Sequence, residues 1–123
     1  MEDQNKKVLV VDDDATIVKL LQNILVMEGF TVVVAKDGLE AMVQVRNHQP
    51  QLIVLDIMMP ELNGYDVCNT IKFDSPYKDT PIILLTSRDQ EIDARIGQMM
   101  GIHYLQKPVN RETFIAKVKQ ILK

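Results

Sequence analysis

The chain has 123 residues, of which 46% are hydrophobic and 25% charged, and this is the balance of one folded domain rather than of a disordered segment. Its net charge of -3 argues against nucleic-acid binding by this segment, because a phosphate backbone requires a basic surface. The lone Cys68 fits a reducing compartment. The sequence has no secretion signal, and its apolar runs are far shorter than the roughly 18 residues of a membrane span. We therefore expect a cytoplasmic protein without membrane contacts.

Five short runs rich in branched apolar residues follow one another along the chain. They are Val8–Val11, Val32–Ala35, Leu52–Leu55, Ile82–Leu85 and the weaker Tyr104–Leu105. The first four runs are continuous rather than alternating, which is typical of strands that are buried on both faces of a parallel sheet.

Segments with helical periodicity separate these runs. The first carries apolar residues at the i, i+3, i+4 and i+7 positions of an amphipathic helix, namely Ile17, Leu20, Leu21 and Ile24. Gly29 fits the end of that helix, and Asn110 stands where an N-cap would begin the last one. We also expect Val18 and Leu25 to be exposed on the first helix, where they would offer an apolar docking surface for a partner.

Strands and helices that alternate in this way predict an α/β fold. We expect a (βα)5 arrangement, which is a doubly wound, parallel five-stranded sheet with right-handed crossovers and helices on both faces. The sequence contains no internal repeat or linker, and the last helical segment reaches Lys123. We therefore expect residues 1–123 to form a single domain.

Polar residues follow the apolar runs directly. Val11 is followed by Asp12, Asp13 and Asp14, Leu55 by Asp56, Leu85 by Thr86, and the fifth run by Lys107. Ligands of open parallel sheets bind outside the carboxyl ends of the strands, where the strand order reverses. Clustered carboxylates need a compensating cation, and oxygen ligands without His or Cys favour Mg²⁺, with Mn²⁺ as an alternative ion. Together with an amine and a hydroxyl, this set predicts phosphoryl transfer to a carboxylate.

Each of these residues also has a plain structural interpretation. Asp13 or Asp14 could cap the first helix, Thr86 could be an ordinary buried hydroxyl, and Lys107 a solvated charge. Asp56 is harder to explain in this way, because it lies between two apolar stretches and an aspartate is rarely buried without a partner.

Four segments of the chain resemble the receiver domains of response regulators, the phosphoacceptor switches of two-component signal transduction systems. The segments are KVLVVDDD at 7–14, LIVLDIMMPELNGYDV at 52–67, PIILLTS at 81–87 and YLQKP at 104–108. The resemblance implies a flavodoxin-like strand order of 2-1-3-4-5. It further implies that Asp56 accepts a phosphoryl group from a histidine kinase or phosphotransfer protein, as a step of signalling or of a phosphorelay. Such a protein assists its own phosphorylation and dephosphorylation and is not a turnover enzyme.

The resemblance also implies the ligands of the metal ion. Asp13 and Asp56 would bind Mg²⁺, Asp12 would help to hold it, and the backbone carbonyl of Met58 would supply a further ligand.

Three further residues have implied roles in the switch. Lys107 would pair with Asp56 and then with the phosphoryl oxygens, and its bond to Pro108 would be cis. Thr86 would move its hydroxyl onto the phosphoryl group, and Tyr104 would rotate inward behind it. The face of the fourth helix, fifth strand and fifth helix, including residues around 93–100, would then change its conformation and contact an output partner or a fused effector that the sequence does not name.

Two alternatives remain. Residues 12–16 fit the DxDxT signature of haloacid-dehalogenase-type phosphatases, in which Asp12 would be the Mg²⁺-dependent nucleophile, although Asp56 then has no role. The other alternative is an interaction module that works without phosphorylation. Such a module is expected to have lost the phosphoacceptor or the lysine, and this sequence retains both.

Overall fold

Each of the five predicted strands is present, and each is longer than its apolar run. The computed structural model describes residues 6–57, 64–73, 77–86 and 101–122. The strands are β1 (Lys7–Val11), β2 (Thr31–Ala35), β3 (Leu52–Asp56), β4 (Ile82–Thr86) and β5 (Ile102–Gln106). Strand β5 differs most from its predicted run. It lies at an edge of the sheet and is mostly half-buried, so its sequence is not continuously apolar.

The helices begin and end at residues with recognisable capping chemistry. They are α1 (Ala15–Met27), α2 (Gly38–His48), α3 (Gly64–Phe73) and α5 (Arg111–Leu122). The side chains of Asp14 and Asp37 cap α1 and α2, and the Asn110 side chain accepts a hydrogen bond from the Thr113 N–H at the start of α5. Gly29 follows α1 with a φ of 94°, as its predicted role in ending that helix requires. The helix expected between β4 and β5 falls on residues 87–100, outside the described residues.

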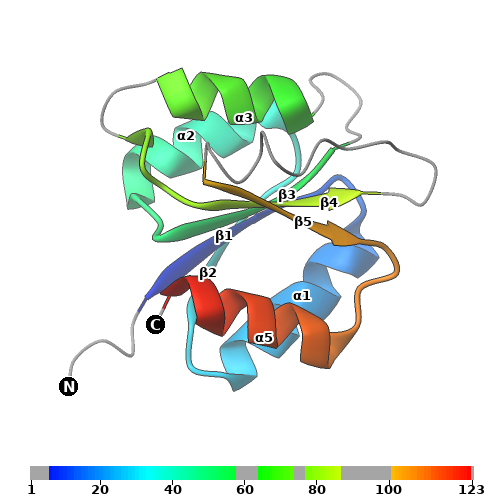
Figure 1. Cartoon of the computed structure of the whole chain (residues 1–123). Coiled ribbons are helices and arrows are strands. Elements are labelled where there is room, and N and C mark those ends of the chain that lie inside the picture. Colours follow the sequence, from blue (N-terminus) through cyan, green and yellow to red (C-terminus); the bar gives the residue numbers. More distant parts are fainter. Residues whose placement is uncertain (1–5, 58–63, 74–76, 87–100, 123) are drawn as a thin grey trace.

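The sheet has the strand order β2-β1-β3-β4-β5, and every neighbouring pair is parallel, so the order implied by the resemblance is confirmed. All five carboxyl ends therefore lie along the same edge of the sheet (Figure 1). The chain passes from β1 outward to β2 and then returns across β1 to β3, so the strand order reverses between β1 and β3. This is the position at which doubly wound sheets bind ligands.

Helices cover the sheet on both faces, with α2 and α3 on one side and α1 and α5 on the other (Figure 1). Alternate residues of each strand point to opposite faces, so that Leu9 and Leu55 pack towards α2 and α3 whereas Val10 and Val54 pack towards α1 and α5. Cys68 is buried in the α2–α3 layer, where burial raises the pKa of its thiol to about 11. It is a core residue of α3.

The expectation for Leu25 is wrong. Leu25 is fully buried and belongs to the core layer that also contains Phe114 of α5, because α1 is covered by that helix as well as by the sheet. Val18 is half-buried, and the exposed large apolar residues of α1 are Leu20, Val26 and Met27.

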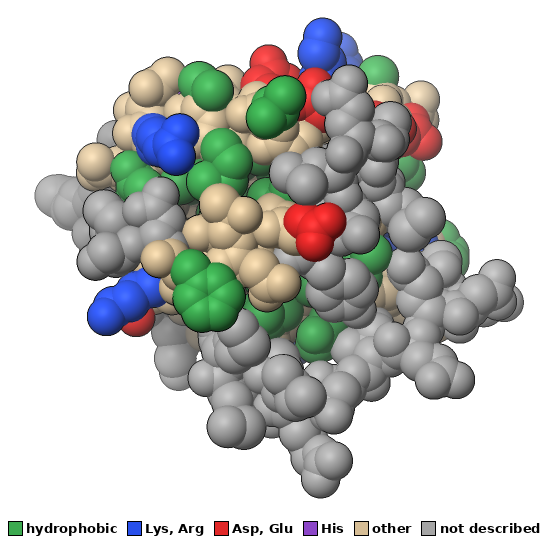
Figure 2. Space-filling model, turned by 90° about the horizontal axis from the view of Figure 1, so that it is seen from above, with side chains coloured by type: hydrophobic (Ala, Val, Ile, Leu, Met, Phe, Trp, Pro, Cys, Tyr) green, Lys and Arg blue, Asp and Glu red, His purple; other side chains and the backbone are tan. Residues whose placement is uncertain are grey.

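On the opposite side of the molecule, the face over α2 and α3 is mixed in character. Figure 2 shows hydrophobic side chains between charged and other polar groups on this face. Of the residues that the structure describes there, Leu39 and Val43 of α2 and Phe73 of α3 are exposed and both large and apolar. Within the described part of the chain, no helix has both the length and the apolar character that crossing a membrane requires.

Candidate functional site

Asp56 is the last residue of β3 and is 4% exposed. The strand places it at the carboxyl edge of the sheet, where one of its oxygens, Oδ1, lies 2.9 Å from the Nζ atom of Lys107. Burial by itself would lower the pKa of Lys107, but the hydrogen bond and charge of Asp56, with smaller contributions from Asp12 and Asp14, raise it above its usual value. The lysine therefore remains an ammonium ion, and the carboxylate beside it has the partner that its burial requires.

Asp12 and Asp13 follow β1, the strand next to β3, and bring two more carboxylates to the same place. One oxygen of each of Asp12, Asp13 and Asp56 lies within 4.8 Å of the others. Asp12 is 1% exposed, and burial raises the pKa of its carboxyl group to about 6, with a further contribution from the charge of Asp56. Asp13 is exposed, so the cluster is open to solvent on one side. Among the described residues the cluster has three carboxylates, of which Asp56 is paired with Lys107, so negative charge remains at the carboxyl edge.

The oxygens of this cluster fit a hard divalent cation. Among the described residues, the buried Oδ2 atom of Asp12 has no hydrogen-bond partner, which is costly for a carboxylate oxygen unless an ion satisfies it. Carboxylate oxygens are the ligands that Mg²⁺ prefers in proteins. A groove of about 410 Å³ between α1 and β2 reaches Asp12 and Asp13 and gives the cluster access to solvent. Met58, whose carbonyl is the fourth expected ligand, lies outside the described residues.

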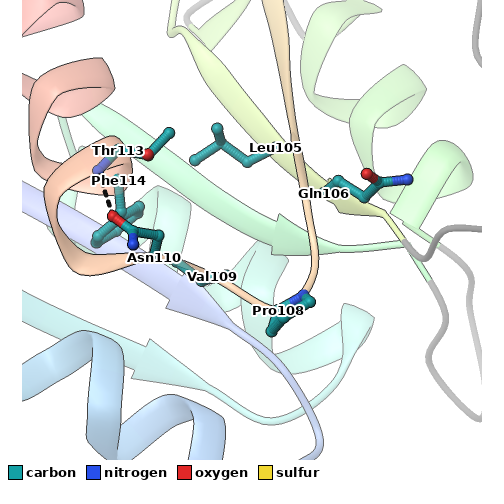
Figure 3. Close-up of a pocket in the computed structure, with 7 residues that line it drawn as sticks. All are labelled: Leu105, Gln106, Pro108, Val109, Asn110, Thr113 and Phe114. Atoms are coloured by element: carbon teal, nitrogen blue, oxygen red, sulfur yellow. Dashed lines mark hydrogen bonds between the residues drawn. The ribbon is translucent and has the colours of Figure 1, made fainter.

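Lys107 is held in place by the turn that joins β5 to α5. Its backbone N–H donates to the carbonyl oxygen of Thr86 at 2.7 Å, and the Lys107–Pro108 bond is cis, as the resemblance implied. Figure 3 shows the chain passing from Gln106 through Pro108 to Asn110, the residue before α5. A pocket of about 240 Å³ beside this turn includes the fully buried Phe114 in its lining. The packing of α5 thus fixes the turn that directs the lysine towards Asp56.

Thr86 and Tyr104 lie on the neighbouring strands β4 and β5. Thr86 ends β4 and is buried, and its hydroxyl donates to the carbonyl oxygen of Leu105 at 3.5 Å, the outer limit of a hydrogen bond. Such a weak interaction is easily exchanged for a stronger acceptor. Tyr104 is half-buried and packs against the core layer under α2 and α3. The structure therefore brings Asp12, Asp13, Asp56, Thr86 and Lys107 to one edge of the sheet, as the sequence predicted, with Tyr104 on the strand beside Thr86.

One contribution to the site could not be read from residue types. The backbone N–H of Asp14 donates to Oδ1 of Asp12 at 3.0 Å, while the Asp14 side chain caps α1. The sequence suggests the cap, but the hydrogen bond to Asp12 depends on the path of the turn and has no sequence signal of its own.

Comparison with known proteins gives a consistent picture. The family model of the response regulator receiver domain matches residues 8–119. The chain is 42% identical over 120 residues to the alkaline phosphatase synthesis transcriptional regulatory protein PhoP of Bacillus subtilis, covering 97% of the chain and 49% of that protein. It is 38% identical over 122 residues to the protein PilG of Pseudomonas aeruginosa, covering 97% of the chain and 90% of that protein. The chain thus spans about half the length of the transcriptional regulators it matches and most of the length of PilG.

Solved structures show the same fold. A putative response regulator from Chloroflexus aurantiacus is 32% identical and superposes with a TM-score of 0.86, covering 96% of this chain and 98% of that one. The chemotaxis response regulator CheY4 of Vibrio cholerae is 31% identical, also with a TM-score of 0.86, covering 96% and 99% of the two chains. These matches do not favour the haloacid-dehalogenase alternative.

Proposed function

The chain belongs to the family of response regulator receiver domains, and on that premise we propose that it is switched by phosphorylation of Asp56. The observation that carries the proposal is the buried Asp56 carboxylate, which is paired with Lys107 at 2.9 Å and faces two further carboxylates. The phosphoryl donor is a phosphohistidine on a kinase or phosphotransfer protein, or a small acyl phosphate. We place the reaction in the cytoplasm, and the segment itself binds neither nucleic acid nor membrane.

The chemistry is a substitution at phosphorus. An Asp56 oxygen attacks the phosphorus atom, a P–O bond to Asp56 forms, and the bond from phosphorus to the donor nitrogen or oxygen breaks, with the electron pair leaving on the donor. Lys107 neutralises negative charge on the acceptor first and on the phosphoryl oxygens afterwards. Water can later attack the same phosphorus and regenerate Asp56, so the protein assists its own phosphorylation and dephosphorylation and is not a turnover enzyme.

A divalent cation completes this arrangement. Asp12, Asp13, Asp56 and the carbonyl of Met58 would hold Mg²⁺, or Mn²⁺ in its place. The Oδ2 atom of Asp12, which has no hydrogen-bond partner within the described part of the chain, supports this assignment. When bound, the ion would neutralise charge that develops on the phosphoryl oxygens.

The response to phosphorylation begins at Thr86. Its hydroxyl exchanges the long contact with Leu105 for a phosphoryl oxygen, and Tyr104 moves into the space behind it. The surface of β5 and α5, with the fourth helix that the sequence predicts, then changes its population of states, and an output partner or fused effector reads the change. Moving such an equilibrium from 1:99 to 99:1 takes about 5.5 kcal/mol, more than one charged hydrogen bond supplies, so partner binding completes the shift.

The proposal is tested by incubating the protein with acetyl phosphate and Mg²⁺ and measuring its intact mass. We expect wild type to gain one acid-labile phosphoryl group and Asp56→Asn to gain none. Asp37→Asn, which removes the same charge at the cap of α2 from a residue outside the cluster, should behave as wild type. An Asp56→Asn protein that still gains the group would refute the assignment. Multiple turnover of p-nitrophenyl phosphate that depends on Asp12 rather than Asp56 would instead support the phosphatase alternative.

A further inference from the structure

Asp14 stands directly after the two acidic residues of the cluster, but its own carboxylate does not join them. Its Oδ1 atom accepts hydrogen bonds from the N–H groups of Thr16 at 2.9 Å and Ile17 at 3.4 Å, and so caps the N-terminus of α1. The backbone of Asp14 is extended, with φ of -90° and ψ of 107°. Two hydrogen bonds to the first turn of a 13-residue helix therefore fix where the Asp14 backbone lies.

That backbone position matters to Asp12. The Asp14 N–H donates to Oδ1 of Asp12 at 3.0 Å, so one oxygen of the Asp12 carboxylate is occupied. The other, Oδ2, is buried and lacks a hydrogen-bond partner among the residues that the structure describes. A carboxylate held through one oxygen has its rotation about the Cβ–Cγ bond fixed, and the second oxygen is then available to a cation bound at the cluster that Asp12 forms with Asp13 and Asp56.

We propose that Asp14 is a positioning residue of the metal site. By capping α1, its side chain holds its backbone N–H against Oδ1 of Asp12, and this contact orients the free Oδ2 atom towards the ion. The inference rests on the proposed function, since it concerns the Mg²⁺ site of the same cluster. Groups that orient a metal ligand without touching the metal change affinity by about 10- to 100-fold when they are removed.

The cap and the charge of Asp14 make different predictions for substitutions. Asn and Ser offer a side-chain oxygen at an N-cap and carry no charge, whereas Ala offers no such oxygen. If the cap orients Asp12, Asp14→Asn and Asp14→Ser keep the function of the side chain and Asp14→Ala loses it. If Asp14 acts only through its negative charge near the ion, all three substitutions weaken binding alike. Asp14→Gly serves as a second test of cap loss, because helices tolerate Gly at this position with little loss of stability.

The experiment is a calorimetric titration of the full chain with Mg²⁺, without any phosphoryl donor. We expect Asp14→Ala and Asp14→Gly to weaken Mg²⁺ binding by roughly 10-fold or more, and Asp14→Asn and Asp14→Ser to stay within about 3-fold of wild type. The matched control is Asp37→Ala, which removes the equivalent cap of α2, where the Glu40 N–H donates to Asp37 at 2.8 Å. It should lower resistance to urea as Asp14→Ala does and leave Mg²⁺ affinity unchanged, which separates positioning from a general loss of stability.

The outcomes distinguish the inference from the proposal beneath it. Wild type that binds no Mg²⁺ contradicts the proposed metal site and the inference together. Wild type that binds Mg²⁺, with Asp14→Ala and Asp14→Gly binding it equally well, overturns the inference alone. Equal losses in Asp14→Asn and Asp14→Ala would also overturn it, because charge rather than capping would then be responsible.

Discussion

Replacing Asp12 by Asn should make the metal-free protein more stable, although Asp12 is one of the residues on which its function depends. Burial raises the pKa of Asp12 from 3.8 to about 6, and the charge of Asp56 adds to the shift, while the Asp14 N–H and Lys107 oppose it. A shift of this size corresponds to about 3 kcal/mol by which the folded state disfavours the ionised carboxylate. Asn has nearly the same shape and no charge, so Asp12→Asn should gain up to that amount at pH 7.5.

The sign of the pH dependence follows from the same shift. Because the pKa of Asp12 is higher in the folded protein than in the unfolded chain, the destabilisation from this group is fully present above about pH 6. It is relieved as the pH falls from about 6 towards 4, and Asp12→Asn should lack this contribution to the pH profile. A bound divalent ion also relieves it, and at a hundred times its dissociation constant the ion would add about 2.7 kcal/mol.

The assay is urea unfolding followed by circular dichroism, in EDTA and in Mg²⁺, at pH 7.5 and pH 5. Wild type should gain stability both from Mg²⁺ and from the lower pH, whereas Asp12→Asn should begin more stable in EDTA and respond little to Mg²⁺. Asp37→Asn, which removes one negative charge at the α2 cap, should show no such gain. If Asp12→Asn is no more stable than wild type in EDTA at pH 7.5, the electrostatic reasoning about this cluster is wrong.

Three further substitutions test the ion pair, the packing of α5 and a helix end by urea unfolding. Lys107→Met leaves the buried Asp56 carboxylate without its partner and should lower the free energy of unfolding by about 1–3 kcal/mol. Adding Asp56→Asn should recover most of this loss, and additive effects of the two substitutions would contradict their coupling. Phe114→Ala empties a fully buried position under α5 and should cost about 3–5 kcal/mol, so a loss below 1 kcal/mol would mean that α5 is not anchored there. Gly29→Ala should lower the free energy of unfolding by about 1–2 kcal/mol through the φ of 94° alone, because an added Cβ meets no atom within 4 Å. Asparagine tolerates this conformation better than alanine, so an equal loss in Gly29→Asn would argue against backbone strain.

Much of the fold follows from local signals in the sequence. Continuous apolar runs indicate buried parallel strands, and Gly29 and Asn110 mark helix ends where the structure has them. The signal is weakest at β5, because an edge strand is half solvated and can carry polar residues such as His103 and Gln106. Leu25 was misjudged for a related reason, since a helical stripe shows which residues are apolar but not that a second helix, α5, covers the flank of α1.

The site was predictable as a set of residues but not as a geometry. Parallel strands bring their carboxyl ends to one edge, so the residues after β1, β3, β4 and β5 had to meet there once the strand order was known. Two features depend on the path of a three-residue turn: the Asp14 N–H that binds Oδ1 of Asp12, and the Oδ2 atom that is left without a partner among the residues described in the structure. The sequence names the residues of that turn but contains no information about which oxygen each N–H reaches.

The most direct test of the central claim is to locate the covalent phosphate. The protein is incubated with acetyl phosphate and Mg²⁺, the acyl phosphate is reduced with borohydride, and the chain is digested and sequenced by mass spectrometry. Reduction converts a phosphorylated aspartate into homoserine, so our account predicts homoserine at position 56 in wild type and at no position in Asp56→Asn. Homoserine at position 12 or 13, or equal labelling of the Asp56→Asn protein, would contradict it.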